Sequence, residues 1–227
     1  MTIKEQKFSY RGQAVIEIEG LIQEESYRLA NKYTHETFTP EHIAECPRRI
    51  IYRSLGQQSE SSISYLEFSQ TERLREKWTD FMGRCRGIKV IDKNVVVADW
   101  ERNLYGSVDV IIKYVDDIYV VQVCGVQTSE IEKIRANGAI KNDVLATMLK
   151  LWMIEKKNGF LLYDDQQGNF CIFQIKYSTP IINSVIKKCN TLLQFKLNGG
   201  IPARPYNDKM AKECTKCEYQ NKCWDLK

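Results

Sequence analysis

Hydrophobic positions along this chain of 227 residues follow two different periods, one helical and one typical of strands. In TFTPEHIAECPRRIIYRSL, Ile43, Ile50 and Ile51 form an apolar stripe, and Thr39 and Pro40 suit the N-cap and the first position of a helix. The stretch SISYLEFSQTERLREKWTDFMGR has the pattern of a longer amphipathic helix. The N-terminal third is therefore predicted to be helical.

From residue 87 the pattern changes to short runs rich in β-branched residues, which are typical of strands. These runs are GIKVID, NVVVADW, GSVDVIIKY and DIYVVQVCGV, with turn-like DKN and VDD between them. A helix is predicted in NDVLATMLKLWMIEKKNG, then strands in GFLLYDD and FCIFQIKYS, and a last amphipathic helix in PIINSVIKKCNTLLQFKLN. This order predicts an α/β fold with a mixed sheet flanked by helices.

The absence of repeats and of long Pro- or Gly-rich linkers favours a single domain over 1–227. Within it we expect a helical part at 1–84, an α/β core at 85–200 and a cysteine-rich tail at 201–227. The 33 basic and 29 acidic residues leave a net charge of +4, which permits contact with nucleic acid but is weak support for it. No apolar run reaches the roughly 18 residues of a membrane helix, and MTIKEQKFSYRG lacks the apolar core of a signal peptide. We therefore expect a cytoplasmic or otherwise intracellular protein with no membrane partner.

Eight cysteines in a reducing compartment favour metal ligands and buried thiols over disulfides. The segment ECTKCEYQNKCWDLK places Cys214, Cys217 and Cys223 in a C-x2-C-x5-C array, which lacks one ligand of a four-thiolate site. Cys46, in AECPRRIIY, has the most suggestive neighbourhood for the fourth ligand. Buried packing is favoured for three of the remaining thiols, Cys85, Cys171 and Cys189.

On these motifs the chain resembles the RecB-like PD-(D/E)XK nucleases that carry an iron–sulfur cluster, a group that includes CRISPR-associated RecB-like exonucleases and the AddB nuclease domain. The resemblance implies a PD-(D/E)XK core. It also implies that Cys46, Cys214, Cys217 and Cys223 bind a [4Fe–4S] cluster, which joins the two chain ends as a structural clasp. Zinc remains the alternative, because tetrahedral four-cysteine sites are common.

The same resemblance implies an active site of the form G-x-x-D followed by E-x-K on the next strand. Gly106 and Asp109 match the first element, whereas Gln122 and Cys124 replace the glutamate and lysine of the second. Both changes remove charge that holds Mg²⁺ or orients water. The Q-x-x-x-Y signature is absent as well, because its positions fall near Ala146 and Lys150. An upstream histidine is also missing, since His35 and His42 lie outside the long N-terminal helix.

We therefore expect a catalytically degenerate protein that binds DNA for its processing, with Arg48 and Arg49 as candidate phosphate contacts. One alternative is an active nuclease, dependent on Mg²⁺ or Mn²⁺, that uses Asp109 with a relocated acid and lysine. Candidates for the relocated groups are Glu72, Glu76, Glu130, Lys133 and Lys141. The other alternative is an adaptor that binds a protein partner and has given up DNA.

Overall fold

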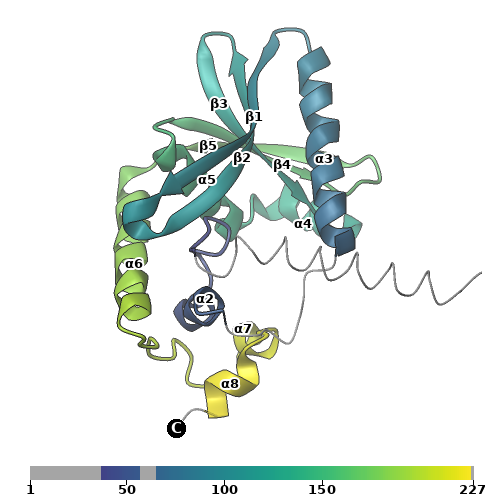
Figure 1. Ribbon diagram of the computed structural model, residues 1–227. Helices are drawn as coiled ribbons and strands as arrows, with labels where there is room; N and C mark the ends of the chain where they lie inside the picture. The colour runs from purple at the N-terminus through teal and green to yellow at the C-terminus, as the bar shows by residue number, and fades with distance from the viewer. Residues whose placement is uncertain (1–36, 57–64, 226–227) are drawn as a thin grey trace, which may run out of the picture.

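A five-stranded mixed sheet forms the centre of the molecule in the computed structural model, which describes residues 37–56 and 65–225 (Figure 1). Its strands follow one another in sheet order as β1 (Ile88–Asp99), β2 (Leu104–Tyr114), β3 (Asp117–Gly125), β4 (Asn158–Asp164) and β5 (Phe170–Lys176). Antiparallel pairing joins β1 to β2, β2 to β3, and β4 to β5, while β3 and β4 are parallel. The predicted α/β fold with a mixed sheet is thereby confirmed.

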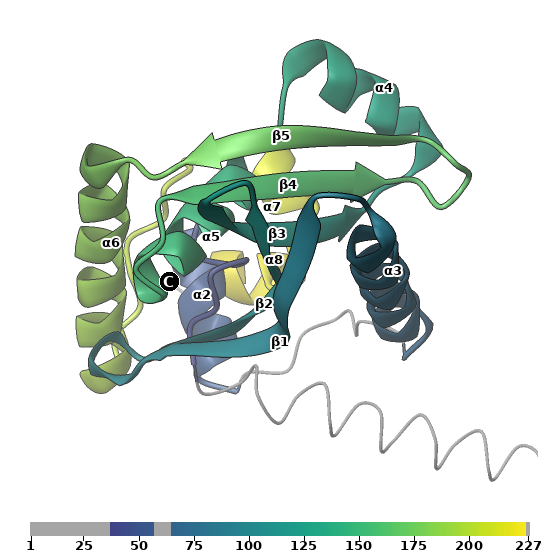
Figure 2. The same cartoon turned by 90° about the horizontal axis from the view of Figure 1, so that it is seen from above.

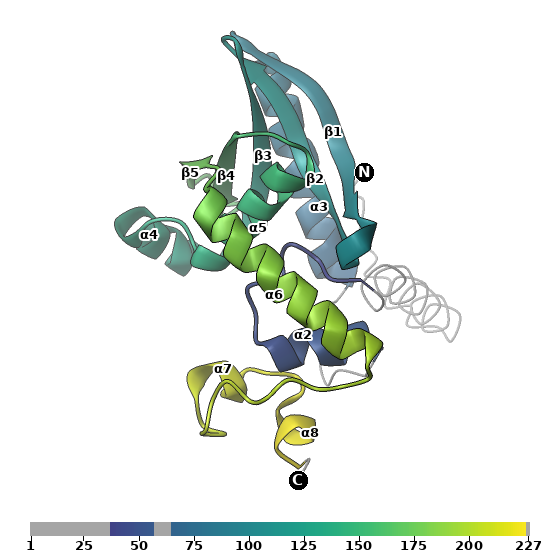
Figure 3. The same ribbon diagram turned by 90° about the vertical axis from the view of Figure 1, so that its left-hand side faces the viewer.

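The helices surround this sheet, and two of them form the crossover that the parallel pair β3–β4 requires. Their bounds are α2 (Pro47–Ser54), α3 (Tyr65–Arg84), α4 (Thr128–Asn137), α5 (Lys141–Met153), α6 (Thr179–Leu197), α7 (Lys212–Thr215) and α8 (Gln220–Asp225), with a short 3-10 turn η1 (Trp100–Arg102) between β1 and β2. In Figure 2, α3 covers one face of the sheet, and α5 lies on the other. Figure 3 shows α2, α7 and α8 gathered below α6, away from the sheet.

Two apolar clusters pack the sheet between these helices, as alternating side chains of a strand point to opposite faces. On β4, Leu161 and Tyr163 belong to the larger cluster with α5 and α6, whereas Leu162 belongs to the smaller cluster beneath α3. Trp78 of α3 anchors that smaller cluster. Within the described residues no helix is long and apolar enough to cross a membrane.

Two predicted boundaries are wrong. The first helix begins at Pro47 rather than Pro40, because Cys46 adopts an extended conformation with φ −56° and ψ 129°, as residues before proline prefer. Residues 40–45 instead form turns. The segment DKN is not a turn between two strands. Strand β1 runs through it as 12 residues, with a register shift between Val90 and Asp92.

The segment before α2 is attached to the sheet at the start of β2. Phe38 forms a parallel bridge with Leu104: its N–H donates to the Asn103 carbonyl at 2.8 Å, and its carbonyl accepts from the N–H of Tyr105 at 2.9 Å. Pro40 then packs on Gly106, so closely that a Cβ at Gly106 would lie 2.8 Å from the Pro40 Cδ. The glycine of the G-x-x-D motif therefore makes room for the turn that follows Thr39.

We predict that Gly106→Ala destabilises the protein by about 1–3 kcal/mol, because neither a strand backbone nor a proline ring can yield easily. Gly83→Ala is the matched control, since the nearest atom to its new Cβ is 3.9 Å away and Gly83 lies in a helix. Urea unfolding of both variants measures the difference. Equal midpoints would show that Pro40 moves aside without cost.

Candidate active site

Asp109 is a buried carboxylate on β2, with 2% of its surface exposed, and it faces β3. Val110 pairs with Val121, so Gln122 occupies the next position opposite Asp109. The Asp109 Oδ2 accepts hydrogen bonds from Gln122 Nε2 at 2.5 Å and from the backbone N–H of Val123 at 2.7 Å. The predicted neighbourhood of Asp109 and Gln122 is therefore present in the structure.

The other oxygen of Asp109 faces helix α3. Arg75 Nε lies 2.9 Å from Asp109 Oδ1 as an ion pair, although neither atom has a partner with hydrogen-bond geometry among the described residues. Arg75 also pairs with Glu72 at 2.5 Å. Asp109 Oδ1 is therefore a buried carboxylate oxygen that has a cation beside it and can still accept a hydrogen bond.

Lys150 brings a second cation to the same place from α5. Its side chain is fully buried, and its Nζ donates a hydrogen bond to Gln122 Oε1. The same Nζ lies 2.5 Å from Glu41 Oε1, in the turn held by Pro40 and Gly106. Gln122 thus links Asp109 to Lys150 through its amide nitrogen and its amide oxygen, and Lys150 in turn pairs with Glu41.

The electrostatics differ between the two carboxylates. Burial raises the pKa of Asp109, and the nearby charges of Arg75 and Lys150 only partly oppose that effect. Burial also raises the pKa of Glu41, but the ion pair with Lys150 outweighs it and leaves this pKa below its usual value. The side chain of Glu41 is 45% exposed, whereas that of Lys150 is 1% exposed. Glu41 is consequently the part of the constellation that solvent reaches.

Lys150 and Glu41 are the two residues that the sequence interpretation missed. Lys150 was assigned to a lost Q-x-x-x-Y position, and Glu41 to an N-terminal helix. A signal for Lys150 exists, because it stands between Leu149 and Leu151 in an otherwise apolar run of α5. Of the candidates for relocated groups, Glu72 lies beside the site, because it pairs with the Arg75 that contacts Asp109. The other candidates are exposed: Glu76, Glu130, Lys133 and Lys141.

Cys124, two positions after Gln122 on β3, sits where the resemblance implies a lysine. Burial raises the pKa of its thiol, and the negative charges of Asp143 and Asp109 raise it further. A thiol held neutral in this way supplies neither a charge nor a metal ligand at neutral pH. Lys150 provides the ammonium instead, from a helix rather than from β3.

The donor set suits a hard divalent cation of the Mg²⁺ type, which binds through one or two carboxylates and keeps water or phosphate as its other ligands. Asp109 Oδ1 and Glu41 are the carboxylate groups that can serve. Across residues 37–56 and 65–225, no three or more His, Cys, Asp or Glu side chains are arranged so that they could hold a metal ion. A cation here therefore depends on two carboxylates and on ligands from outside the chain.

The fold is shared with solved exonucleases. An alkaline exonuclease (LHK-Exo) from Laribacter hongkongensis matches with a TM-score of 0.56 at 11% identity over 78% of this chain and 93% of that chain. A phage-related exonuclease from Haemophilus somnus matches with a TM-score of 0.52 at 9% identity over 74% and 96%. The chain has the PD-(D/E)XK exonuclease fold. The protein SSO0001 shares it as well, with a TM-score of 0.56 and 13% identity over 89% and 94%.

At these low sequence identities the structural matches establish the fold only, and the chemistry has to be argued from this chain's own residues. LHK-Exo also has a structure in complex with dAMP, which matches this chain with a TM-score of 0.55 at 12% identity over 78% and 93%. No family model and no curated protein matches the chain. The exonuclease fold therefore rests on structure, while the iron–sulfur part of the resemblance stays a prediction.

In this exonuclease-fold chain, the four cysteines singled out from sequence line a single cavity of about 550 Å³ between α2 and the C-terminal helices. Burial raises the pKa of the Cys214 thiol, and the neighbouring thiolates of Cys223 and Cys46 raise it further. Burial likewise raises the pKa of the Cys217 thiol, with smaller contributions from the charges of Glu218 and Cys46. Cys46 and the three cysteines of the tail thus line one cavity, and the metal that the resemblance implies there stays a prediction.

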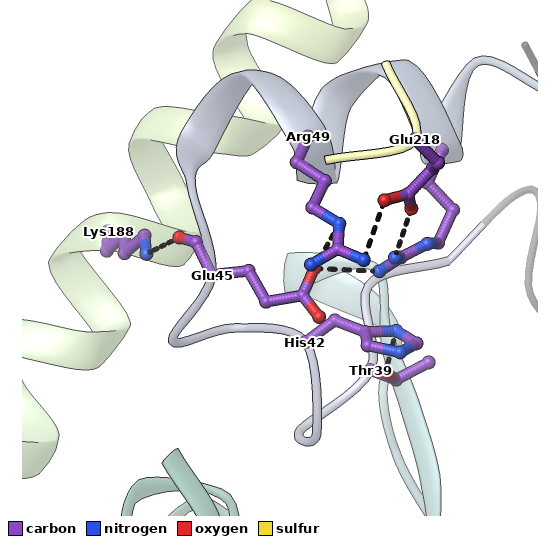
Figure 4. A network of polar contacts seen from close by, with 7 residues as sticks. Thr39, His42, Glu45, Arg49, Lys188 and Glu218 are labelled. Carbon is purple, nitrogen blue, oxygen red and sulfur yellow. Dashed lines mark hydrogen bonds and ion pairs between the residues drawn. The ribbon is translucent and has the colours of Figure 1, made fainter. Parts of the chain in front are cut away.

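An ion-pair network lies directly beside this cavity and joins α2 to the tail (Figure 4). Glu218, the residue after Cys217, pairs with Arg49 at 2.7 Å and with Arg53 at 3.0 Å. Glu45, the residue before Cys46, pairs with the same two arginines at 3.4 and 3.1 Å. Two acids next to predicted cysteine ligands therefore share two arginines of one helix.

The network has little access to solvent at its centre. The Glu218 side chain is 7% exposed, and those of Glu45 and Arg53 are 16% exposed. Burial by itself raises the pKa of Glu218, but the hydrogen bond and charge of Arg49 outweigh it and lower that pKa. Lys188 of α6 adds a hydrogen bond to the Glu45 carbonyl at 2.8 Å. We call these four side chains, Glu45, Arg49, Arg53 and Glu218, the tail latch.

The two arginines proposed from sequence as phosphate contacts have different surroundings. Arg49 belongs to the tail latch. Arg48 is 8% exposed, and its Nη2 donates to the hydroxyl of Tyr52 at 3.1 Å. The other four cysteines, Cys85, Cys124, Cys171 and Cys189, lie outside the thiol-lined cavity. Cys189 is fully buried, and burial raises the pKa of its thiol to about 12, while Cys85 and Cys171 are half-buried.

We predict that Glu218→Gln lowers the free energy of unfolding by about 2 kcal/mol at neutral pH, because it leaves two partly buried arginines short of a charge partner. Glu213→Gln is the matched control: it makes the same change beside Cys214, on an exposed side chain. Denaturant unfolding and the rate of proteolysis within the tail measure both variants. Identical unfolding and proteolysis of the two variants would show that the tail latch does not stabilise the protein.

Proposed function

We propose that this protein is a metal-dependent DNA nuclease whose lysine has moved from the strand to helix α5. The observation that supports this most strongly is the buried ammonium of Lys150, placed against Gln122 and Glu41 beside Asp109. Burying a lysine costs several kcal/mol, roughly, unless it is paired. A paired, buried charge at this position, beside the aspartate of the G-x-x-D motif, favours a functional role over a structural one.

The residues divide the work as follows. Asp109 Oδ1 and Glu41 would hold the divalent ion, and the bound ion would supply stabilisation of the charge that develops on the scissile phosphate. Lys150, which is buried, would position the other groups, because its Nζ donates to the Gln122 amide oxygen and pairs with Glu41. Gln122, which is neutral, fixes Asp109 with its amide N–H and Lys150 with its amide oxygen, so both charged groups keep their direction.

The fold and the nucleotide-bound relative support DNA as the substrate. The protein whose complex with dAMP is known shares this architecture. The net charge of +4 is compatible with contacts to a phosphate backbone. Both arguments concern the class of substrate, and they leave strandedness and direction to the assay.

A second candidate is a DNA-binding protein of the same fold without cleavage, which one contact favours. Arg75 Nε lies 2.9 Å from Asp109 Oδ1, the oxygen that a divalent ion needs. In such a pseudonuclease the guanidinium takes the place of the ion. Replacing Arg75 by glutamine separates the cases, since it raises Mn²⁺ affinity if the guanidinium competes with the ion.

The direct test is cleavage of linear single- and double-stranded DNA with Mg²⁺ or Mn²⁺ and with chelator. We expect Lys150→Met to reduce cleavage at least about 10²-fold, because it removes the charge that holds Gln122 and Glu41 in place. Methionine fills a similar volume, and the Glu41 side chain is 45% exposed, so water can solvate its carboxylate once Lys150 is lost. Circular dichroism and the unfolding midpoint check that the variant is folded. Lys133→Met is the control on an exposed lysine.

The outcome that contradicts the nuclease proposal is an absence of metal-dependent cleavage by a folded wild-type protein that binds DNA. That result would favour the pseudonuclease. Equal activity of Lys150→Met and wild type would instead show that cleavage is independent of the constellation around Asp109. Asp109→Asn and Glu41→Gln test the metal ligands separately. The nuclease proposal predicts that each variant cleaves DNA at least about 10²-fold more slowly.

We further propose that Cys46, Cys214, Cys217 and Cys223 bind a [4Fe–4S] cluster that ties the tail to α2. The shared cavity of about 550 Å³ supports this proposal. Thiolates that bind separate irons of one cluster need not converge on a single atom, as zinc ligands must. The cluster would have a structural role, because it lies by α2, α7 and α8 rather than at Asp109.

We expect anaerobically purified protein to be brown, with absorption near ~400 nm and bound iron. Cys46→Ser should abolish both signals, whereas Cys171→Ser, at a half-buried cysteine outside the cavity, should leave them unchanged. Metal analysis of the same samples distinguishes the metals. A colourless protein that contains zinc would show that the four cysteines bind zinc and not an iron–sulfur cluster.

A further inference from the structure

A cavity of about 530 Å³ adjoins the thiol-lined cavity, where α2 meets the chain that leads into the tail. The two cavities share Arg48, Arg204, Tyr206 and Trp224. The lining of the cavity of about 530 Å³ comprises Arg48 of α2, Trp224 of α8, and Pro202, Ala203, Arg204, Tyr206 and Asn207 between α6 and α7. The lining contains two guanidinium groups, one phenol and one amide, and it contains no carboxylate. It is therefore a positively charged hollow on a chain whose overall charge is only +4.

Arg48 contributes a guanidinium that its protein partners do not saturate. Its Nη2 donates to Tyr52 at 3.1 Å, and its Nε is buried without a hydrogen-bond partner within the described part of the chain. A buried guanidinium N–H without an acceptor is costly, since such groups are normally paired. An anion in the cavity would supply the missing acceptor.

Arg204 is fixed on the other side of the cavity. Its Nε and Nη2 donate to the Cys223 carbonyl at 3.1 and 2.8 Å, and its guanidinium stacks over the Trp224 ring at 4.7 Å. Stacking and hydrogen bonding hold the guanidinium in one orientation, so little entropy is lost when a ligand binds. Arg48 and Arg204 also act together on Tyr52, because both charges oppose the effect of burial, which raises the pKa of that hydroxyl.

We propose that this cavity binds a phosphate group of DNA, with Arg48 and Arg204 as the charged contacts and Tyr206 and Asn207 as polar ones. Guanidinium groups recognise phosphate by paired hydrogen bonds, and a cavity of this volume is large enough for one nucleotide. The proposal rests on DNA as the substrate. Of the two arginines singled out in the sequence, it assigns phosphate to Arg48 and leaves Arg49 to the tail latch.

The test places a negative charge at the exposed rim without touching either arginine. Ala203 lines the cavity and is exposed, so Ala203→Glu and its isosteric control Ala203→Gln differ only in charge. Affinity for a fluorescent single-stranded oligonucleotide is measured by anisotropy in chelator, where no cleavage occurs, at several salt concentrations. Asn207→Asp repeats the test from another position if Ala203→Glu fails to fold.

We expect Ala203→Glu to bind about tenfold more weakly at low salt, with a salt slope smaller by about one phosphate contact. Ala203→Gln should match wild type. Oligonucleotides with a 5′-phosphate and with a 5′-hydroxyl identify the source of the phosphate. An equal loss for both assigns an internal phosphodiester, and a loss confined to the phosphorylated strand assigns the terminus.

Equal affinity and salt slope of the Glu and Gln variants would overturn the inference, as would a wild type that binds neither oligonucleotide. These outcomes are separate from the fate of the nuclease proposal. Cleavage by wild type with Mn²⁺, together with indistinguishable Ala203 variants, would leave the nuclease standing without this pocket. Weaker binding by Ala203→Glu in a protein that never cleaves would leave the pocket standing without the nuclease.

Discussion

The buried ammonium of Lys150 is the interaction on which the account of the site depends. A lysine without exposed surface is stable only when its charge and its donors are paired, and here Gln122 and Glu41 pair them. Gln122 in turn holds Asp109, so the position of one α5 side chain determines the geometry of both neighbouring strands at this point. On the proposed function, the ammonium that the resemblance implies on β3 comes from Lys150 of α5 instead.

The turn between Thr39 and Cys46 connects this site to the thiol-lined cavity. It begins where Phe38 pairs with β2, and it continues with Pro40 packed on Gly106. It then places Glu41 on Lys150, and four residues later Glu45 in the tail latch. Because the segment is short and held at each of these points, the placement of Glu41 and the docking of the tail rest on the same few residues.

The fold and half of the site could be predicted from the sequence. β-branched runs revealed the strands, and the hairpin register placed Gln122 opposite Asp109. Glu41 and Lys150 could not be found this way, because their meeting depends on a crossover helix and on a turn whose position is set by Pro40 against Gly106. The resemblance assigned Lys150 to a missing Q-x-x-x-Y position. A lysine between two leucines on a buried helix face is nevertheless itself a signal of a buried charge.

Mn²⁺ binding tests the central claim most directly, since it examines the two carboxylates without requiring turnover. Free Mn²⁺ is followed by electron paramagnetic resonance as wild type and the double variant Asp109→Asn, Glu41→Gln are titrated without DNA. The account predicts that wild type binds about one ion that the double variant does not, as expected for a site of two carboxylates and outside ligands. Identical titration curves would contradict it, because Asp109 and Glu41 would then hold no metal.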